Sequence, residues 1–139
     1  MSKPIRILIV SNDATTLSQC ESFLCSLEHA AVRTCNGHNA MREFHSDIPD
    51  IVLTDVVMPD KDGIEILLEI RRTAPGTYVV AMSGNCKSLN SDFALHLAQN
   101  LGADGILVKP FDTHQLRRTV EPLISQKTAG QTEAGDECP

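Results

Sequence analysis

Five short apolar segments, each followed by a stretch with helical periodicity, limit most strongly what this chain can fold into. The segments are rich in β-branched residues and do not alternate with polar ones, which is typical of strands buried on both faces. They span residues 5–10, 31–35, 50–54, 78–82 and 105–108. Between and after them, apolar residues recur every three or four positions, so each of these stretches predicts an amphipathic helix.

Five such strand–helix units in 139 residues predict one parallel sheet with helices on both of its faces. Right-handed crossover connections restrict the possible topologies to a few. In open sheets of this kind the functional crevice lies beyond the carboxyl ends of the strands. We therefore look for a site in the segments that directly follow the strands, at residues 11–13, 55–62, 83–91 and 109–111.

Composition excludes several classes of function. The net charge is -6 and only 4% of the residues are aromatic, which argues against nucleic acid or a membrane surface as the main partner. No apolar run approaches the ~20 residues that a membrane-spanning helix needs. The five cysteines include no CxxC pair, so neither a metal site nor a disulfide framework is predicted, and a cytoplasmic location is expected.

The C-terminal segment differs from the rest of the chain. Residues 126–139 contain no aliphatic residue larger than Ala and are rich in Gly, Thr and acids, so we predict a disordered tail after a domain that spans residues 1–125. Just before this tail, Pro122 lies inside the last predicted helix. Because proline lacks a backbone N–H, the helix is expected to kink or to end near Glu121.

A carboxylate, a hydroxyl and an ammonium group follow three different predicted strands. Asp55 ends the third strand, Ser83 follows the fourth, and Lys109 follows the fifth. Residues 11–13, after the first strand, add further oxygen ligands. Because the carboxyl ends of parallel strands meet at one edge of a sheet, these groups should converge on one crevice. Such a set suits phosphoryl transfer in the presence of a hard cation.

These motifs resemble the receiver domain of two-component response regulators. The matching pieces are LTDVVMPDKDG around Asp55, MSG at Ser83 and LVKPF around Lys109, and the resemblance covers residues 4–125. Each piece is weak alone, but their order along the chain is specific. The resemblance implies a flavodoxin-like, doubly wound α/β fold, with a five-stranded parallel sheet of strand order 2-1-3-4-5.

The resemblance also implies roles for individual residues. Asp55 would be the phosphoacceptor, with a histidine kinase or a histidine phosphotransfer protein as the donor. Ser83 and Gly84 would contact the phosphoryl group, and Lys109 would neutralise it. The peptide bond between Lys109 and Pro110 is expected to be cis, as in the family. The domain would signal by contact with a downstream effector protein and would not act as a metabolic enzyme.

The first strand departs from the family pattern. Receiver domains usually carry two adjacent acids here, whereas this chain has Ser11 and Asn12, and its acid comes one place late, at Asp13. Mg²⁺ demands near-octahedral oxygen ligands and dehydrates reluctantly. A magnesium site formed with Asp55, Asn12, Asp13 and Val57 is therefore expected to be weak. We favour Asp13 as the N-cap of the first helix.

Two more departures fall in the region that the resemblance identifies as the switch and output face. Ile106 stands where family members usually carry an aromatic residue, so signalling by rotation of an aromatic side chain is not expected. Pro110 belongs to the same region. The chain between Ser83 and Lys109 is longer than usual, and the extra length is expected to enlarge the loop at residues 84–91.

The leading hypothesis is a single-domain response regulator in a phosphorelay. The alternative is a pseudo-receiver, which would use the same fold as a binding module without phosphorylation. The missing acids favour the alternative, whereas Asp55, Ser83 and Lys109 favour the leading hypothesis. A phosphatase with Asp55 as nucleophile is less favoured, because such enzymes need a second acid nearby and position 57 is Val57.

Overall fold

The strands and helices alternate along the chain as the sequence predicts, and every strand lies within one residue of its predicted bounds. The strands are β1 (Ile5–Val10), β2 (Ala30–Cys35), β3 (Ile51–Asp55), β4 (Tyr78–Ser83) and β5 (Gly105–Val108). The helices are α1 (Ala14–Cys25), a single 3₁₀ turn η1 (Gly37–Asn39), α2 (Ala40–Ser46), α3 (Gly63–Thr73) and α5 (Thr113–Glu137). Residues 96–100 are also helical.

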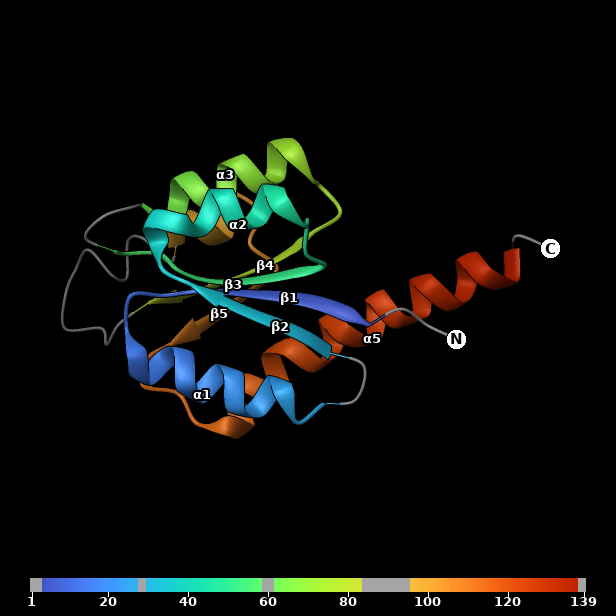
Figure 1. The fold of residues 1–139 in the computed structure, drawn as a ribbon, viewed down its shortest axis with the longest axis horizontal. Coiled ribbons are helices and arrows are strands. Elements are labelled where there is room, and N and C mark those ends of the chain that lie inside the picture. Colours follow the sequence, from blue (N-terminus) through green and yellow to red (C-terminus); the bar gives the residue numbers. More distant parts are fainter. Residues whose placement is uncertain (1–3, 28–29, 59–61, 84–95, 138–139) are drawn as a thin grey trace.

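The computed structural model describes residues 4–27, 30–58, 62–83 and 96–137, with side chains described to residue 128. Its five strands form one sheet in the order β2-β1-β3-β4-β5, and all four pairings are parallel. Figure 1 shows α2 and α3 covering one face of the sheet and α1 and α5 covering the other. This arrangement confirms the predicted doubly wound, flavodoxin-like fold.

Both faces of the sheet are buried, which explains the continuous apolar runs of its strands. Successive strand residues point to opposite faces. Ile7 and Leu53 therefore join the core under α1 and α5, whereas Leu8 and Val52 join the core under α2 and α3. All five residues of β3, the central strand, are buried. The sheet is thus held on both sides, and its strand ends are fixed in space.

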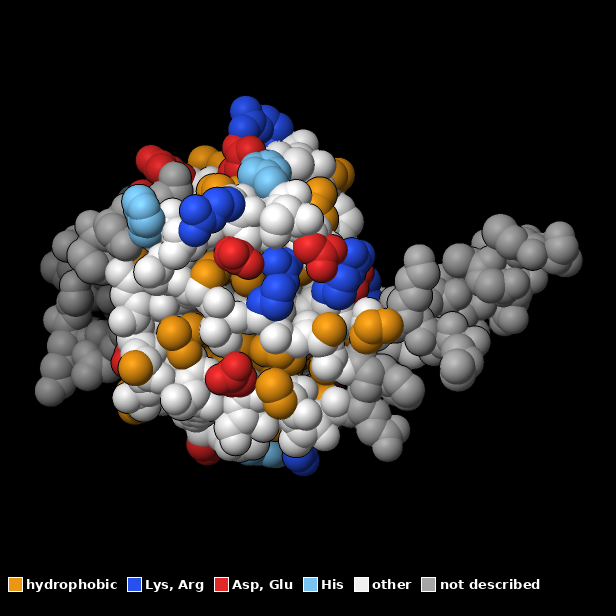
Figure 2. Space-filling model, in the orientation of Figure 1, with side chains coloured by type: hydrophobic (Ala, Val, Ile, Leu, Met, Phe, Trp, Pro, Cys, Tyr) orange, Lys and Arg blue, Asp and Glu red, His pale blue; other side chains and the backbone are white. Residues whose placement is uncertain are grey.

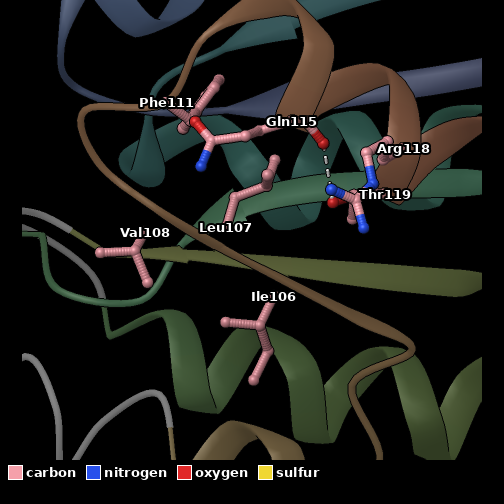
Figure 3. A pocket seen from close by; sticks show the side chains of 7 residues that line it. All are labelled: Ile106, Leu107, Val108, Phe111, Gln115, Arg118 and Thr119. Carbon is pink, nitrogen blue, oxygen red and sulfur yellow. Dashed lines mark hydrogen bonds between the residues drawn. The ribbon is translucent and has the colours of Figure 1, made fainter.

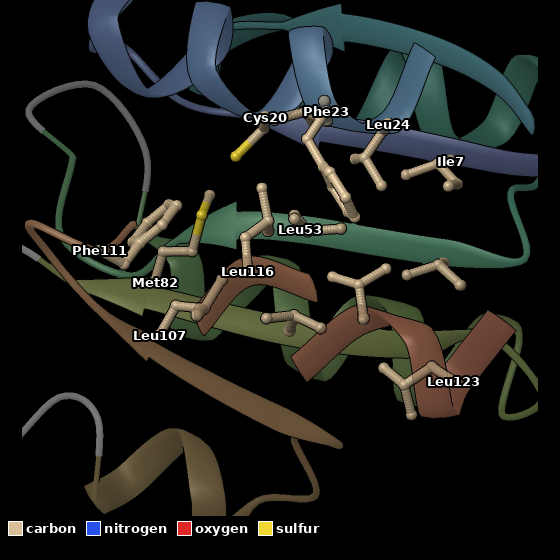
Figure 4. Packing of buried hydrophobic residues seen from close by; sticks show 14 of the residues in the cluster. Ile7, Cys20, Phe23, Leu24, Leu53, Met82, Leu107, Phe111, Leu116 and Leu123 are labelled. Carbon is tan, nitrogen blue, oxygen red and sulfur yellow. The ribbon is translucent and has the colours of Figure 1, made fainter. Parts of the chain in front are cut away.

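The core beneath α1 and α5 is formed by aliphatic, aromatic and sulfur-containing side chains. Figure 4 shows Cys20 and Leu24 of α1 facing Leu53 of the sheet, with Leu116 of α5 packed against them. Burial raises the pKa of the Cys20 thiol to about 12, so the thiol stays protonated at neutral pH. Cys20 therefore acts as a small apolar core residue.

A glycine allows α3 to begin directly beside the end of β3. Asp62 caps this helix by accepting a hydrogen bond from the backbone N–H of Ile64 at 2.9 Å. The next residue, Gly63, donates its N–H to the carbonyl oxygen of Val56 at 2.9 Å. A Cβ atom at Gly63 would lie only 2.1 Å from the carbonyl oxygen of Asp55. The absent side chain therefore lets the helix approach the strand end that carries Asp55.

Pro122 was predicted to kink the last helix or to end it near Glu121, and the second of these outcomes is wrong. The helix continues through Pro122. Leu116, Val120 and Leu123 are buried against the sheet on both sides of this proline. Packing of this apolar stripe offsets the loss of one backbone hydrogen bond, and tertiary contacts rather than intrinsic propensity decide the outcome.

The same helix also extends through residues 126–137, where the sequence predicts a disordered tail. Figure 1 shows this part of α5 projecting beyond the end of the sheet. A helix that is already formed adds one hydrogen bond per residue without the cost of nucleation. Packing also holds the start of the segment, because Tyr78 donates its hydroxyl to Gln126 Oε1 at 2.7 Å. The backbone of residues 126–137 is thus described as helical, and disorder of the tail in solution stays a prediction.

Charges of both signs are interspersed on the surface. Figure 2 shows acidic and basic side chains side by side on the face that it presents. Among the described residues, ion pairs join Arg6 to Asp47, at 2.8 Å, and Arg33 to Glu43, at 3.1 Å. Within the described ranges, no helix is long and apolar enough to cross a membrane.

Candidate functional site

Asp55 lies at the carboxyl end of the central strand, with only 5% of its surface exposed. Its neighbour across the sheet is Met82, one residue before Ser83, so the ends of β3 and β4 are level. Lys109 follows β5 and places its Nζ atom 2.7 Å from Asp55 Oδ1. The structure thus brings the predicted carboxylate and ammonium into direct contact, although 54 positions separate them in the sequence.

The backbone around Lys109 fixes the direction of its side chain. The Lys109 N–H donates to the carbonyl oxygen of Ser83 at 2.7 Å, which extends the pairing of β4 with β5 by one step. The peptide bond from Lys109 to Pro110 is cis, as the resemblance implies. The Lys109 side chain is only 17% exposed, so its ammonium is largely removed from solvent beside Asp55.

Ser83 ends β4 as predicted and is 1% exposed. Among the described residues, its Oγ atom has no hydrogen-bond partner. A buried hydroxyl without a partner costs about 1–3 kcal/mol, so a ligand oxygen at this position would be stabilised. Gly84, the other predicted phosphoryl contact, lies outside the described residues, as does the predicted loop at residues 84–91.

Ser11 belongs to the predicted group of oxygen ligands at residues 11–13, but its direct contact with Asp55 was not predicted. Its hydroxyl donates to Asp55 Oδ2 at 2.5 Å and accepts the backbone N–H of Asp13 at 3.0 Å. Its own N–H donates to the carbonyl oxygen of Cys35 at 3.1 Å, and the residue is fully buried. A small polar residue at the buried end of the first strand was the available signal, because that position usually carries an acid.

Asp13 caps α1, which confirms the role that the sequence favoured. Its carboxylate accepts the backbone N–H of Thr15 at 3.1 Å and the hydroxyl of Thr16 at 2.8 Å. The hydrogen bond from Thr16 lowers the pKa of Asp13 below its ordinary value. Lys109 Nζ lies 3.8 Å from Asp13 Oδ2, so the cap is also the second carboxylate near this ammonium.

The remaining predicted ligands do not assemble a tight magnesium site. The side-chain oxygen of Asn12 accepts the backbone N–H of Gly37 at 3.0 Å. Val57 is 58% exposed and has no side-chain oxygen, so only its backbone carbonyl could serve. Within the described residues, no three His, Cys, Asp or Glu side chains form a group that could hold a metal ion. The residues present therefore fit Mg²⁺ poorly.

Two hollows adjoin the strand ends. The larger, of about 340 Å³, is lined by Ile106, Leu107, Val108, Phe111, Gln115, Arg118 and Thr119. Figure 3 shows that these side chains come from β5, the segment after it, and α5. Ile106 is half-buried and packs against the core beneath α2 and α3. The smaller hollow, of about 260 Å³, is lined by Asp13, Thr15, Thr16, Gln19, Lys109, Pro110 and Phe111.

Comparison with known proteins agrees with this geometry. The family model described as the response regulator receiver domain matches residues 7–121. Among curated proteins, the chemotaxis protein CheY of Halobacterium salinarum is 30% identical over 90 residues, which cover 65% of this chain and 72% of that protein. A probable transcriptional regulator, ycf27, of Guillardia theta is 27% identical over 121 residues, 86% of this chain.

Solved structures show the same architecture. The response regulator receiver domain protein from Clostridium thermocellum superposes with a TM-score of 0.76 at 27% identity, covering 89% of this chain and 97% of that one. The CheY-like receiver domain protein from Methanospirillum hungatei gives a TM-score of 0.75 at 25% identity, covering 92% of this chain and 99% of that one.

Several relatives are longer proteins. The chain spans 45% of the length of the Guillardia theta regulator and 24% of that of the transcriptional regulator NtrC from Azospirillum brasilense. The part of the chain that the family model matches, residues 7–121, contains all five strands of the sheet. The chain therefore belongs to the response regulator receiver domains, the signalling modules of two-component systems.

Proposed function

We propose that this chain accepts a phosphoryl group on Asp55 and signals by contact with another protein. One observation carries the proposal: the buried Asp55 carboxylate contacts the Lys109 ammonium at 2.7 Å, at the sheet edge where the buried Ser83 hydroxyl has no partner in the described part of the chain. A phosphoryl group on Asp55 would bring oxygen atoms that accept from both donors. The site therefore contains an acceptor, a charge to neutralise the product, and an unused hydrogen-bond donor.

The transfer is an in-line displacement. A carboxylate oxygen of Asp55 forms the new O–P bond while the bond from phosphorus to its donor breaks, and the leaving group takes the electron pair. Lys109 neutralises charge on the phosphoryl oxygens, and Ser83 donates to one of them. The protein contributes mainly position and charge. We propose a histidine kinase or a histidine phosphotransfer protein as the donor, and we expect Mg²⁺ to bind weakly.

The output is a protein contact. The 340 Å³ hollow between β5 and α5 is lined by Ile106, Phe111 and Val108, the residue before Lys109. A downstream effector that binds in this hollow would therefore be sensitive to phosphorylation of Asp55. Ile106 lacks a ring, and we therefore propose that any switch acts through packing of β5 against α5. Pro110 stands in the chain between Lys109 of the acceptor site and Phe111, which lines this hollow.

Intact-mass measurement after treatment with acetyl phosphate tests the proposal. We expect a single phosphoryl adduct on the wild type and none on Asp55→Asn. Lys109→Met should label much more slowly, because the product loses its neutralising charge. Asp47→Asn is the matched control, since Asp47 is an exposed acid paired with Arg6 beyond the other end of β3, and it should label like the wild type. Equal labelling of Asp55→Asn would contradict the proposal.

One observation favours a second candidate function, the pseudo-receiver. Asp55 already has a hydrogen bond to one carboxylate oxygen and a salt bridge to the other, from Ser11 and Lys109. In a constitutive binding module, the contacts of Asp55 with Ser11 and Lys109 would serve only to stabilise the fold. The same mass measurement separates the two functions, because a pseudo-receiver gains no adduct either with Mg²⁺ or without it.

A further inference from the structure

We propose that Ser11 makes Asp55 a phosphoacceptor that does not depend on a divalent cation. The inference rests on the proposed function and concerns how the same site is held ready. Ser11 directly follows β1, the strand beside β3. Its hydroxyl donates to Asp55 Oδ2 at 2.5 Å. Lys109 meets the other oxygen, Oδ1, at 2.7 Å. Both carboxylate oxygens are therefore engaged by residues of the chain itself.

The hydrogen bond from Ser11 is fixed in direction. Its Oγ atom accepts the backbone N–H of Asp13 at 3.0 Å, so the single hydroxyl proton remains available for Asp55. The backbone of Ser11 is tied to Cys35 at 3.1 Å and the residue is fully buried, which leaves the side chain little freedom to rotate. Ser11 is thus a preorganised donor whose alignment does not need to be adjusted during the reaction.

The local charges support the same conclusion. The -1 charge of Asp55 faces the +1 charge of Lys109 at 2.7 Å, whereas Ser11 and Asn12 are neutral. Asp13, whose Oδ2 lies 3.8 Å from Lys109 Nζ, is committed to capping α1 and is half-exposed. A site with two more acids would carry an excess of negative charge that a divalent cation must offset before a phosphate dianion can approach. Here the pair is already close to neutral, so that requirement is absent.

Ser11 is accordingly a positioning residue. It holds Oδ2 and leaves Oδ1, the oxygen that faces Lys109, to form the bond to phosphorus. As that bond forms, negative charge moves from Asp55 onto the phosphoryl oxygens. Lys109 and Ser83 stabilise the charge there, by ion pairing and by hydrogen bonding. Loss of the Ser11 hydroxyl would free the carboxylate to rotate away from this alignment.

The experiment compares initial rates of labelling by acetyl phosphate in excess EDTA and in excess Mg²⁺. For the wild type, the labelling rates in EDTA and in Mg²⁺ should differ by less than about tenfold. A site that relies on the cation should label on the order of 100-fold more slowly in EDTA than in Mg²⁺. Ser11→Ala should slow labelling in EDTA by about tenfold or more, because the carboxylate is no longer held in the orientation for attack. Ser11→Thr, which keeps the hydroxyl, should restore the rate. Ser18→Ala, at an exposed serine of α1, should match the wild type.

Circular dichroism checks that each variant is folded. If Ser11→Thr does not fold, the comparison of labelling rates in EDTA between the wild type and Ser11→Ala tests the inference. Calorimetric titration with Mg²⁺ on the unlabelled wild type provides a second readout, in which only weak binding that does not reach saturation is expected. Labelling that requires Mg²⁺, or equal rates for Ser11→Ala and the wild type in EDTA, overturns this inference and leaves the proposed function intact. Absence of any adduct under both conditions overturns both.

Discussion

Three donors lie at the carboxyl ends of three other strands of the sheet, and two of them, Ser11 and Lys109, contact Asp55. Ser11 follows β1, Ser83 ends β4 and Lys109 follows β5, so the acceptor on β3 is reached from both neighbouring strands and from the edge strand. The donors differ in their roles. Ser11 orients the carboxylate and Lys109 neutralises charge, whereas the Ser83 hydroxyl has no hydrogen-bond partner among the described residues. The chemistry at this scale depends on single atoms, and so single substitutions should separate these roles.

Val57→Asn should shorten the lifetime of the phosphorylated protein. Acyl phosphates decay by in-line attack of water, and we expect Val57, two places after the acceptor, to lie beside that approach. Val57 is 58% exposed, so its side chain is not part of the core, and it cannot orient water by hydrogen bonding. An asparagine there should speed decay on the order of tenfold, by positioning the attacking water.

The measurement is the half-life of the adduct by intact mass after removal of acetyl phosphate. Ile48→Asn serves as the control, because Ile48 is an exposed aliphatic residue that precedes β3 at the opposite end of the strand. Its half-life should equal that of the wild type. A half-life in Val57→Asn that is equal to or longer than the wild-type value would show that Val57 does not limit the decay.

At the scale of single elements, the start of α1 depends on Asp13. Removing the cap with Asp13→Ala should lower the free energy of unfolding by about 0.5–2 kcal/mol at neutral pH. The hydrogen bond from Thr16 lowers the pKa of Asp13 below its ordinary value of 3.8. The unfolded chain therefore takes up the proton at higher pH than the folded chain, and the stabilisation is lost as the pH falls through and below 3.8.

Urea denaturation of the wild type and Asp13→Ala at several pH values measures this effect. The difference between the two proteins should be constant near neutral pH and should narrow as the pH drops toward 3. Asp13→Asn, which keeps a capping oxygen, should remain close to the wild type at neutral pH. A difference that widened in acid would mean that Asp13 does not act through its ionised form.

The junction of β3 and α3 should tolerate no side chain at Gly63. The Cβ atom of Gly63→Ala would lie 2.1 Å from the carbonyl oxygen of Asp55 and 2.6 Å from Val56 Cα, so the helix must move away from the strand. Overpacking of this kind typically costs about 1–3 kcal/mol. Labelling of Asp55 should also slow, because the strand end that carries it is displaced.

Gly76→Ala is the matched control for this junction. A Cβ atom at Gly76 would meet nothing within 4 Å, and the residue lies in the turn between α3 and β4. It should leave stability unchanged or raise it slightly, because alanine reduces the entropy of the unfolded chain. Chemical denaturation of both variants gives the comparison, and similar losses in the two would refute the steric explanation.

At the scale of the whole molecule, the two cores share one sheet and should unfold together. Leu67 of α3 is 1% exposed and packs in the core beneath α2 and α3, whereas its neighbour Leu68 is 47% exposed. Leu67→Ala should cost about 2–5 kcal/mol and Leu68→Ala less than about 0.5 kcal/mol. Far-UV circular dichroism during urea denaturation should show a single transition for both proteins. Two separate transitions in Leu67→Ala would mean that the two faces of the sheet are not coupled.

The sequence alone determined the alternation of strands and helices and the order of Asp55, Ser83 and Lys109 at the strand ends. Both follow from local patterns, because hydrophobic periodicity sets each element and parallel strands bring their carboxyl ends to one edge. The cap formed by Asp13 is local as well, and it was predicted for the same reason. The residues of this part of the site could therefore be named before the fold was known.

The tertiary structure alone decided the rest. Ser11 contacts Asp55 across 44 positions of the sequence, and Asn12 directs its oxygen to Gly37, 25 positions away. Neither contact has a local signature, since the partner of a buried polar group depends on which distant atoms the fold places within hydrogen-bond distance. The course of α5 through Pro122 was decided in the same way, because burial of its apolar stripe outweighs the local preference of proline to end a helix.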